Sequence, residues 1–423
     1  MFAFEAKTRS MGKNQVSRRI ALVLLGIIVY AIASTESSYA EDQVAIVEPD
    51  VPAIDSQGEF PYPPDMTVEY CLSLPMQFGE DHNEVTNTFH LPVSSDKLFL
   101  FTKGVWWAQI GTINLLQSTE GSDLVSINIT TTWGYPYPPH NTLKICQFRR
   151  DYNEHGVGIL SVGDPLIEHI PNVQHHIDVI LPASPSNEPL KIKGFDTDLI
   201  VFWHSFLYPS EKVIFGSVSF LGASFNSLSA NHAIFRAYGG PIVGTFSVNS
   251  YLRLQSEGIG YGGINASIAM VNYLDQWTEL EMSTKVDHEI NANLSLYTSD
   301  GDPGGRYRIS TRGSTRLNTT SAPINSTVDL TVNPGEFLAD ITMHETFEGH
   351  IHIDSIYQFR RKISTLDRED PEGRGRKRMF QGLASPKTFD GSVWWDREDD
   401  DSHGDGRGMI AIVPIVRDVI LRL

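Results

Sequence analysis

The second half of the chain repeats one short unit, and this repeat constrains the fold more than any other feature. Each unit is an alternating strand, a turn of small residues and a second strand that opens on isoleucine. These isoleucines are Ile242, Ile264, Ile290, Ile324 and Ile351, at intervals of about 22 to 34 residues. A single unit cannot bury its apolar face alone, so neighbouring units must stack. The pattern predicts a β-solenoid or a repetitive β-sandwich, and the solenoid is favoured because the unit recurs in one direction.

The first half of the chain is also β-rich but lacks this repeat. Strands are expected where β-branched and aromatic residues gather, at Leu98–Thr102, Trp106–Ile113, Leu124–Thr132 and Leu143–Phe148. The segment from Ile170 to Pro189 carries several prolines and is interpreted as a connection. We therefore predict an all-β chain, with an N-terminal β-sandwich-like region over residues 66–200 and a β-solenoid-like stack of strand-pair repeats over residues 201–423. A charged insertion at about residues 360–390 is expected to be a solvated loop.

The N-terminus has the composition of a targeting segment. Basic residues from Lys7 to Arg19 precede an apolar run, Ile20–Ala33, and small residues precede Glu41. The run of about 14 residues is shorter than the roughly 20 that span a bilayer. This favours a cleaved signal peptide over residues 1–40, followed by a polar, proline-rich linker over residues 41–65. The alternative is a signal anchor that stays uncleaved and tethers the protein to the membrane.

The cysteines and the glycosylation sequons agree with a secretory route. Cys71 and Cys146 are the only cysteines, and we predict one disulfide between them; the alternative is two unpaired buried thiols. Five sequons begin at Asn128, Asn265, Asn293, Asn318 and Asn325, which makes these the predicted glycosylation sites. Strand alternation places these asparagines next to inward-facing apolar residues and therefore on outward faces.

Charge and motifs argue against several classes of function. A formal net charge of -18 disfavours nucleic acid as a partner, because binding phosphates requires a basic surface. His344, His350 and His352 do not have the spacing of a helical zinc-protease motif. The acidic residues between Asp396 and Asp405, and the pair Asp300 and Asp302, lack the spacing of a calcium-binding loop. We predict no catalytic residue, no cofactor and no metal site.

Several short motifs resemble a known group of proteins. They are Phe89-His90-Leu91-Pro92 with Leu98-Phe99-Leu100, His155-Gly156-Val157-Gly158-Ile159, Thr320-Ser321-Ala322-Pro323-Ile324 and Gly391-Ser392-Val393-Trp394-Trp395. Together they resemble fungal proteins that carry an adhesin-like β-repeat domain of unknown function, over roughly residues 60 to 423. This resemblance implies a β-repeat fold and no established activity.

The sequence favours a non-enzymatic function. We expect a secreted or cell-surface β-repeat protein with a structural or adhesive role, whose partner is a cell-wall glycan or a surface protein. The alternative is a polysaccharide-binding or polysaccharide-degrading protein on a parallel β-helix, which predicts acidic and aromatic residues along one groove. The pairs Trp106–Trp107 and Trp394–Trp395 can stack on sugar rings, although adjacent residues point to opposite strand faces and half of them should lie in the core.

Cleavage of the N-terminal segment is directly measurable. The small residues Ser38 and Ala40 predict cleavage after Ala40, so the protein secreted by a eukaryotic host should begin at or near Glu41. N-terminal sequencing of the secreted protein checks this. Recovery of the intact N-terminus in the membrane fraction would instead show a signal anchor.

Overall fold

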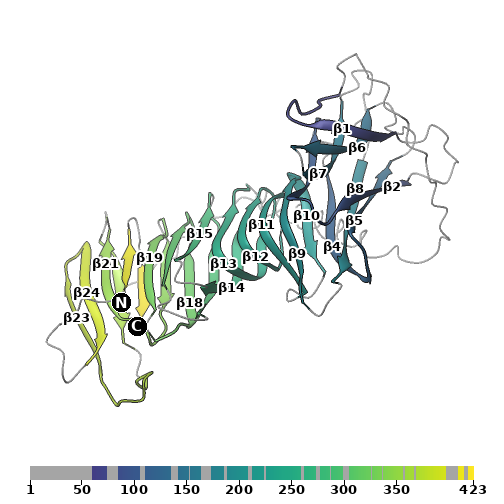
Figure 1. Ribbon diagram of the computed structural model, residues 1–423. Coiled ribbons are helices and arrows are strands. Elements are labelled where there is room, and N and C mark those ends of the chain that lie inside the picture. Colours follow the sequence, from purple (N-terminus) through teal and green to yellow (C-terminus); the bar gives the residue numbers. More distant parts are fainter. Residues whose placement is uncertain are drawn as a thin grey trace, which may run out of the picture. The chain divides into compact units, whose positions relative to one another are not determined.

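The computed structural model describes a chain whose regular elements are β-strands (Figure 1). The described residues are 60–73, 84–104, 110–134, 142–151, 153–162, 173–184, 188–207, 212–222, 225–258, 262–272, 277–285, 287–298, 304–324, 326–335, 337–355, 358–365, 368–396, 408–413 and 418–423. Among them, no helix has the length and apolar character needed to cross a bilayer. The all-β prediction is confirmed. The expected signal segment, residues 1–40, lies outside the described residues.

The first eleven strands cover the N-terminal half and the start of the repeats. They are β1 (Thr67–Ser73), β2 (Glu84–Pro92), β3 (Lys97–Lys103), β4 (Ile110–Gly121), β5 (Leu124–Trp133), β6 (Leu143–Arg150), β7 (Glu154–Ser161), β8 (Val173–Ala183), β9 (Leu190–Asp198), β10 (Val201–Phe206) and β11 (Val213–Gly222). Five of them form a separate sheet in the order β10-β4-β8-β5-β2. The others join a 21-stranded sheet that continues through the repeats.

The remaining strands build the repeats. They are β12 (Leu228–Ala237), β13 (Ile242–Ser256), β14 (Ile264–Asn272), β15 (Thr278–Thr284), β16 (Ile290–Thr298), β17 (Gly304–Ser310), β18 (Thr315–Ser321), β19 (Thr327–Asn333), β20 (Leu338–Thr342), β21 (Gly349–Asp354), β22 (Arg360–Ser364), β23 (Arg378–Ala384), β24 (Thr388–Trp395), β25 (Met409–Ile412) and β26 (Asp418–Arg422).

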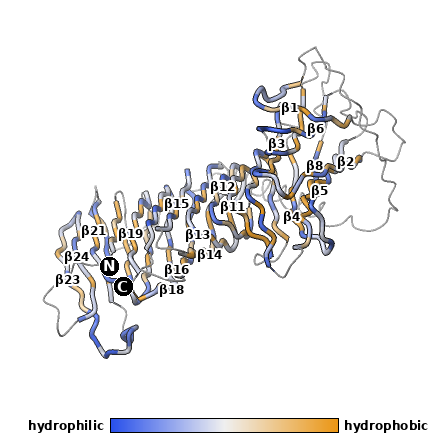
Figure 2. Tube along the Cα trace, in the orientation of Figure 1, coloured by the Kyte–Doolittle hydropathy of each residue, from blue (hydrophilic) through white to orange (hydrophobic). Residues whose placement is uncertain are grey.

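Parallel pairing arranges these strands in two ladders, as expected for a solenoid. The β15 ladder runs β9, β11, β12, the second half of β13, then β15, β17, β19, β25 and β21. The β16 ladder runs from the first half of β13 through β14, β16, β18, β20, β26 and β22. Alternate residues along each strand are buried, and those of both ladders belong to one hydrophobic cluster. Figure 2 shows this alternation of hydrophobic and hydrophilic positions.

The repeat predicts that Ile242, Ile264, Ile290 and Ile324 stack in one interior column, and this is correct for the first three. Ile242 pairs in register with Ile264, and Ile264 with Ile290. All three are at most 1% exposed. The next member is Thr315 rather than Ile324, because β16 pairs with β18 and sets Ile290 opposite Thr315.

The prediction that Ile324 belongs to this column is wrong. Ile324 lies in a turn and is 44% exposed. Ile351 is buried, but it belongs to the β15 ladder, opposite Ile410. The physical reason is that the position opposite Ile290 is occupied by Thr315, a buried threonine, so the column continues without an isoleucine. The next isoleucine along the sequence then falls in a turn.

The C-terminal strands do not stack in sequence order. β25 lies between β19 and β21, and β26 lies between β20 and β22. The inward side chains of this inserted pair are at most 1% exposed: Ile410, Ile412, Val419, Leu421 and Leu423. β21 therefore joins the β15 ladder by pairing with β25, and β22 joins the β16 ladder by pairing with β26.

Three other expected segments differ from the structure. The expected connection from Ile170 to Pro189 contains β8, a central strand whose described proline, Pro182, lies near its end. The expected solvated loop at residues 360–390 contains β22 and β23, which are edge strands with mostly exposed side chains. The expected linker ends earlier than residue 65, because Phe60 is only 7% exposed and packs in a small aromatic cluster. The boundary expected between residues 200 and 201 separates β9 from β10, which pairs with β4 of the five-stranded sheet.

The register predicts that the same substitution, isoleucine to aspartate, has different effects on stability at positions 290 and 324. Ile290→Asp places an unpaired carboxylate inside the stack and should cost several kcal/mol of unfolding free energy. Ile324→Asp, at an exposed turn, should cost about 1 kcal/mol or less. Thermal or denaturant unfolding measures both, with Asn291→Asp as an outward control expected within about 0.5 kcal/mol of wild type. Equal losses for the two isoleucines would contradict the register.

Candidate binding groove

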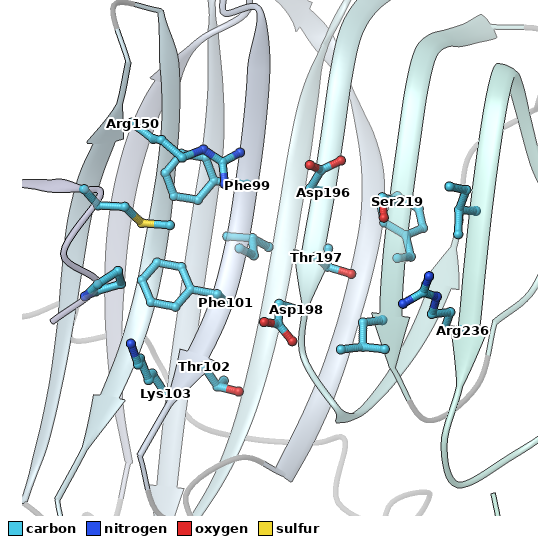
Figure 3. Close-up of a pocket in the computed structure, with 16 residues that line it drawn as sticks. Phe99, Phe101, Thr102, Lys103, Arg150, Asp196, Thr197, Asp198, Ser219 and Arg236 are labelled. Atoms are coloured by element: carbon cyan, nitrogen blue, oxygen red, sulfur yellow. The ribbon is translucent and has the colours of Figure 1, made fainter. Parts of the chain in front are cut away.

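A groove of about 510 Å³ opens where β3, β9, β11 and β12 lie side by side (Figure 3). Strand alternation fixes which side chains reach it. Phe99 and Phe101 of β3 are only 3% and 7% exposed and belong to a second cluster, apart from that of Leu98 and Leu100. Asp196 and Asp198 of β9 flank buried Thr197. The groove is thus built on the side of the sheet opposite the main hydrophobic cluster.

Pairing in register arranges the lining in two rows. The first row is Phe99, Asp196, Ser219 and Ile234, and the second is Phe101, Asp198, Leu221 and Arg236. Each row thus starts at an aromatic ring and crosses a carboxylate. The second row ends at a guanidinium, whose Nε donates a hydrogen bond to Gln255 Oε1 at 3.0 Å.

One wall of the groove is an aromatic cluster. Phe99 and Phe101 pack with Phe60, Cys146, Phe148 and Leu160, and the ring centroids of Phe101 and Phe148 are 5.1 Å apart. Glycines opposite these rings provide the space: a Cβ at Gly156 would lie 2.2 Å from the ring of Phe99. The motif His155-Gly156-Val157-Gly158-Ile159 therefore has a packing role in β7.

A disulfide holds β1, and with it the residues that precede β1, against this wall. Cys71 of β1 and Cys146 of β6 lie directly opposite each other and their sulfur atoms are bonded. Residues Pro63 and Met66, which precede β1, line the groove. The predicted pair of cysteines thus anchors the segment that completes the aromatic wall.

The charged groups of the groove differ in how they are paired. Asp196 Oδ2 lies 3.0 Å from Lys97 Nζ. The Arg150 guanidinium carbon lies 4.9 Å from the centroid of Phe99, a cation–π contact, and its Nε is 2.6 Å from Glu154 Oε2. Among the described residues no cation pairs with Asp198, and burial raises the pKa of its carboxyl above the usual value. Asp198 is therefore the carboxylate most available to a ligand.

Beyond the groove, the outward face of the β15 ladder carries charges that pair between neighbouring strands. Arg253 of β13 forms an ion pair with Glu281 of β15, whose other oxygen lies 3.5 Å from Arg308 of β17. The hydroxyl of Tyr251 donates to Glu281 Oε2 at 3.1 Å. Burial and the adjacent Glu281 raise the pKa of Tyr251 to about 12. These side chains stabilise the stack across strands.

The predicted glycosylation sites fall mainly on the other ladder. Asn265, Asn293 and Asn318 are exposed on the outward face of the β16 ladder. Asn128 is partly exposed on β5 of the five-stranded sheet, where it accepts a hydrogen bond from Thr88 at 2.9 Å. Asn325 lies outside the described residues.

The histidines considered for a metal have separate partners. His352 Nδ1 is 2.6 Å from Asp390 Oδ1, His344 Nδ1 is 2.9 Å from Thr346 Oγ1 and His350 Nδ1 is 3.4 Å from Ser392 Oγ. In the described part of the chain, no three potential ligands from His, Cys, Asp and Glu are grouped to hold a metal ion. Asp300, Asp302 and the run from Glu398 to Asp405 lie outside the described residues.

The tryptophans proposed for sugar contact are divided as alternation predicts. Trp395 is 2% exposed and donates its Nε1 hydrogen to the carbonyl of Glu345 at 3.0 Å, while Trp394 is partly exposed. Trp106 and Trp107 lie outside the described residues. Sequence reasoning missed the groove because its lining comes from strands far apart in the chain. The only local signal was the alternation of Asp196 and Asp198 around Thr197.

Known proteins provide little comparison. No family model and no curated protein sequence matches the chain. The structure of a candidate lipid-binding protein from Parabacteroides distasonis aligns with a TM-score of 0.31 and 9% identity, over 81% of this chain and 98% of its own. That of a candidate cell adhesion protein from Clostridium sporogenes aligns with a TM-score of 0.16 and 7% identity, over 80% of this chain and 99% of its own. At these TM-scores neither carries an argument about fold or function.

The contribution of the disulfide to stability is measurable. The double variant Cys71→Ser, Cys146→Ser opens a loop of 75 residues and should lower the unfolding free energy by about 4 kcal/mol. Denaturant unfolding measures the loss, and the reduced wild-type protein should behave like the variant. Alkylation of two free thiols in the native, unreduced protein, detected by intact mass, would contradict the bond.

Proposed function

We propose that this protein is a non-catalytic, secreted or cell-surface β-repeat protein with a structural or adhesive role. The observation that carries the proposal is the outward face of the β15 ladder, where Glu281 is shared between Arg253 and Arg308 and links three neighbouring strands. These ion pairs stabilise the stacking of neighbouring strands, so this part of the surface has a structural role. An adhesive protein needs such a scaffold, together with one surface free to meet a partner.

The groove supplies that surface. The three described sequons of the repeats lie on the β16 ladder, so glycans there would leave the outward face of the β15 ladder open. The groove on this open face presents the free carboxyl of Asp198 and the guanidinium of Arg236 in one row. A carboxylate and a guanidinium in one row can each hydrogen-bond the hydroxyl groups of a glycan or the polar groups of a protein.

The alternative, a polysaccharide-binding or polysaccharide-degrading protein, is favoured by the acidic and aromatic lining. Glycoside cleavage uses two carboxyl groups on either side of the scissile bond. Here Asp196 and Asp198 project from the same face of one strand, and Asp196 is paired with Lys97. This arrangement suits recognition better than cleavage. The raised pKa of Asp198 nevertheless makes it the residue to test as a proton donor.

Fungal origin and attachment at the cell surface belong to the same proposal. They rest on the N-terminal targeting composition, the sequons and the resemblance to adhesin-like β-repeat proteins. The partner would be a cell-wall glycan or a surface protein.

A double substitution in the groove tests the proposal. Asp198→Asn with Arg236→Gln should weaken binding to cell walls or to arrayed glycans by about tenfold or more, because two charged contacts are lost together. Binding is measured with purified protein, alongside release of reducing sugar from wall polysaccharides.

The matched control is Arg316→Gln, an exposed arginine of the β16 ladder, which should bind like wild type. We expect no sugar release by any of the proteins. Release by wild type that is lost in Asp198→Asn would overturn the non-catalytic proposal in favour of the enzyme. Unchanged binding by the double variant would remove the groove from the adhesive role.

A further inference from the structure

The outward face of the five-stranded sheet is a second surface with a defined chemistry. Pairing in register sets Trp203 of β10, Thr112 of β4, His176 of β8, Thr130 of β5 and Thr86 of β2 in one continuous row. The next row along the strands is Ser205, Asn114, Asp178, Asn128 and Thr88. Adjacent members lie one strand spacing apart, roughly 4.8 Å. Two parallel rows of polar side chains therefore cross the whole sheet.

Hydrogen bonds between strands hold the centre of these rows in place. Thr112 Oγ1 is 2.6 Å from His176 Nδ1. Asn114 Nδ2 donates to Asp178 Oδ1 at 3.0 Å, and the same carboxylate oxygen is 3.2 Å from His176 Nε2. A ligand would meet these groups already oriented, so less conformational entropy would be lost on binding.

Two further contacts extend the fixed rows toward β2. Thr86 Oγ1 and Thr130 Oγ1 are 2.8 Å apart, and Thr88 Oγ1 donates to Asn128 Oδ1 at 2.9 Å. The outward polar side chains are thereby tied in two pairs of strands, β4 with β8 and β5 with β2.

The composition of the face differs from that of an ordinary solvated sheet. None of the five strands contains a lysine or an arginine, in a chain with 33 such residues. At one end of the first row the indole of Trp203 is 47% exposed, although a large apolar ring gains by burial. The face thus combines hydroxyl, amide and imidazole groups with one exposed aromatic surface, and it has little charge.

We propose that this face binds a neutral oligosaccharide, with Trp203 stacked on a sugar ring and Thr112, Asn114 and His176 bonded to its hydroxyl groups. A neutral sugar has apolar C–H faces that match the indole and hydroxyl edges that match the rows. An anionic polymer would find no cation on these strands, and a large apolar partner would bury the polar rows without compensation. The site is separate from the groove and does not rest on the function proposed for it.

The predicted glycosylation site Asn128 lies in the second row, next to Asp178. A glycan on Asn128 would cover the rows, so the proposed binding requires Asn128 to be unglycosylated. The protein for the test is made in the bacterial periplasm, where it carries no glycan and the disulfide can form. Calorimetric titration uses neutral chito-, β-gluco- and manno-oligosaccharides, with an oligogalacturonate as the anionic comparison. We expect binding to at least one neutral oligosaccharide and none to the anionic one.

Matched variants locate the site. Trp203→Ala and His176→Ala should each weaken the affinity by about tenfold or more, since each removes a direct contact. Trp277→Ala is the control, because Trp277 directly precedes β15 and is equally exposed, at 48%. This variant should bind with the affinity of the wild-type protein. Thermal unfolding verifies that every variant is folded.

Several results would overturn the proposal. They are no binding of any neutral oligosaccharide, tighter binding of the anionic one, and equal losses in Trp203→Ala and Trp277→Ala. Loss of binding in Asp198→Asn with Arg236→Gln, but not in Trp203→Ala, would assign the sugar to the groove instead. Because the two sites have separate variants, failure of one proposal leaves the other testable.

Discussion

The structure depends on one constraint, the in-register stacking of buried side chains along parallel strands. Ile242, Ile264 and Ile290 occupy the same position in successive strands, so Ile264 lies between two other isoleucines. Burying a side chain of this size contributes roughly 1.5–3 kcal/mol. A shift of one residue in any strand would turn its apolar side chains outward, so the columns fix the register of every ladder.

Once the register is fixed, the outward faces follow from it and acquire different chemistry. Charged side chains pair between strands on the β15 ladder, as Arg253 does with Glu281. The β16 ladder instead presents asparagines, and Asn318 Nδ2 donates to Asn293 Oδ1 at 3.4 Å. Parallel strands repeat the same lateral position about every 4.8 Å, so a residue type that recurs in the sequence becomes a surface row. Binding surfaces on such a protein are therefore rows rather than pockets enclosed by loops.

The sequence predicted what depends on local alternation and missed what depends on long-range pairing. Alternation gave the strand faces, including the outward position of Asn265 and the inward position of Ile264. It failed at Thr315, because a threonine in a buried column has no apolar signal. It could not give the insertion of β25 and β26, since nothing in their composition says which strands they separate. The groove was missed for the same reason: Phe101 and Arg236 share a row only after four strands are paired.

Disulfide trapping between neighbouring strands tests the register most directly. Asn291 of β16 and Arg316 of β18 are outward and in register. The Cα atoms of cysteines at these two positions should therefore lie within the separation of about 4.4–6.8 Å that a disulfide spans. Oxidation of the folded Asn291→Cys, Arg316→Cys variant should form the bond in nearly all molecules, as judged by intact mass and peptide mapping. The Ile290→Cys, Ile324→Cys variant represents the register in which Ile324 continues the isoleucine column opposite Ile290, and it should remain reduced under the same conditions. A bond in the second variant and not in the first would contradict the stacking on which the whole account rests.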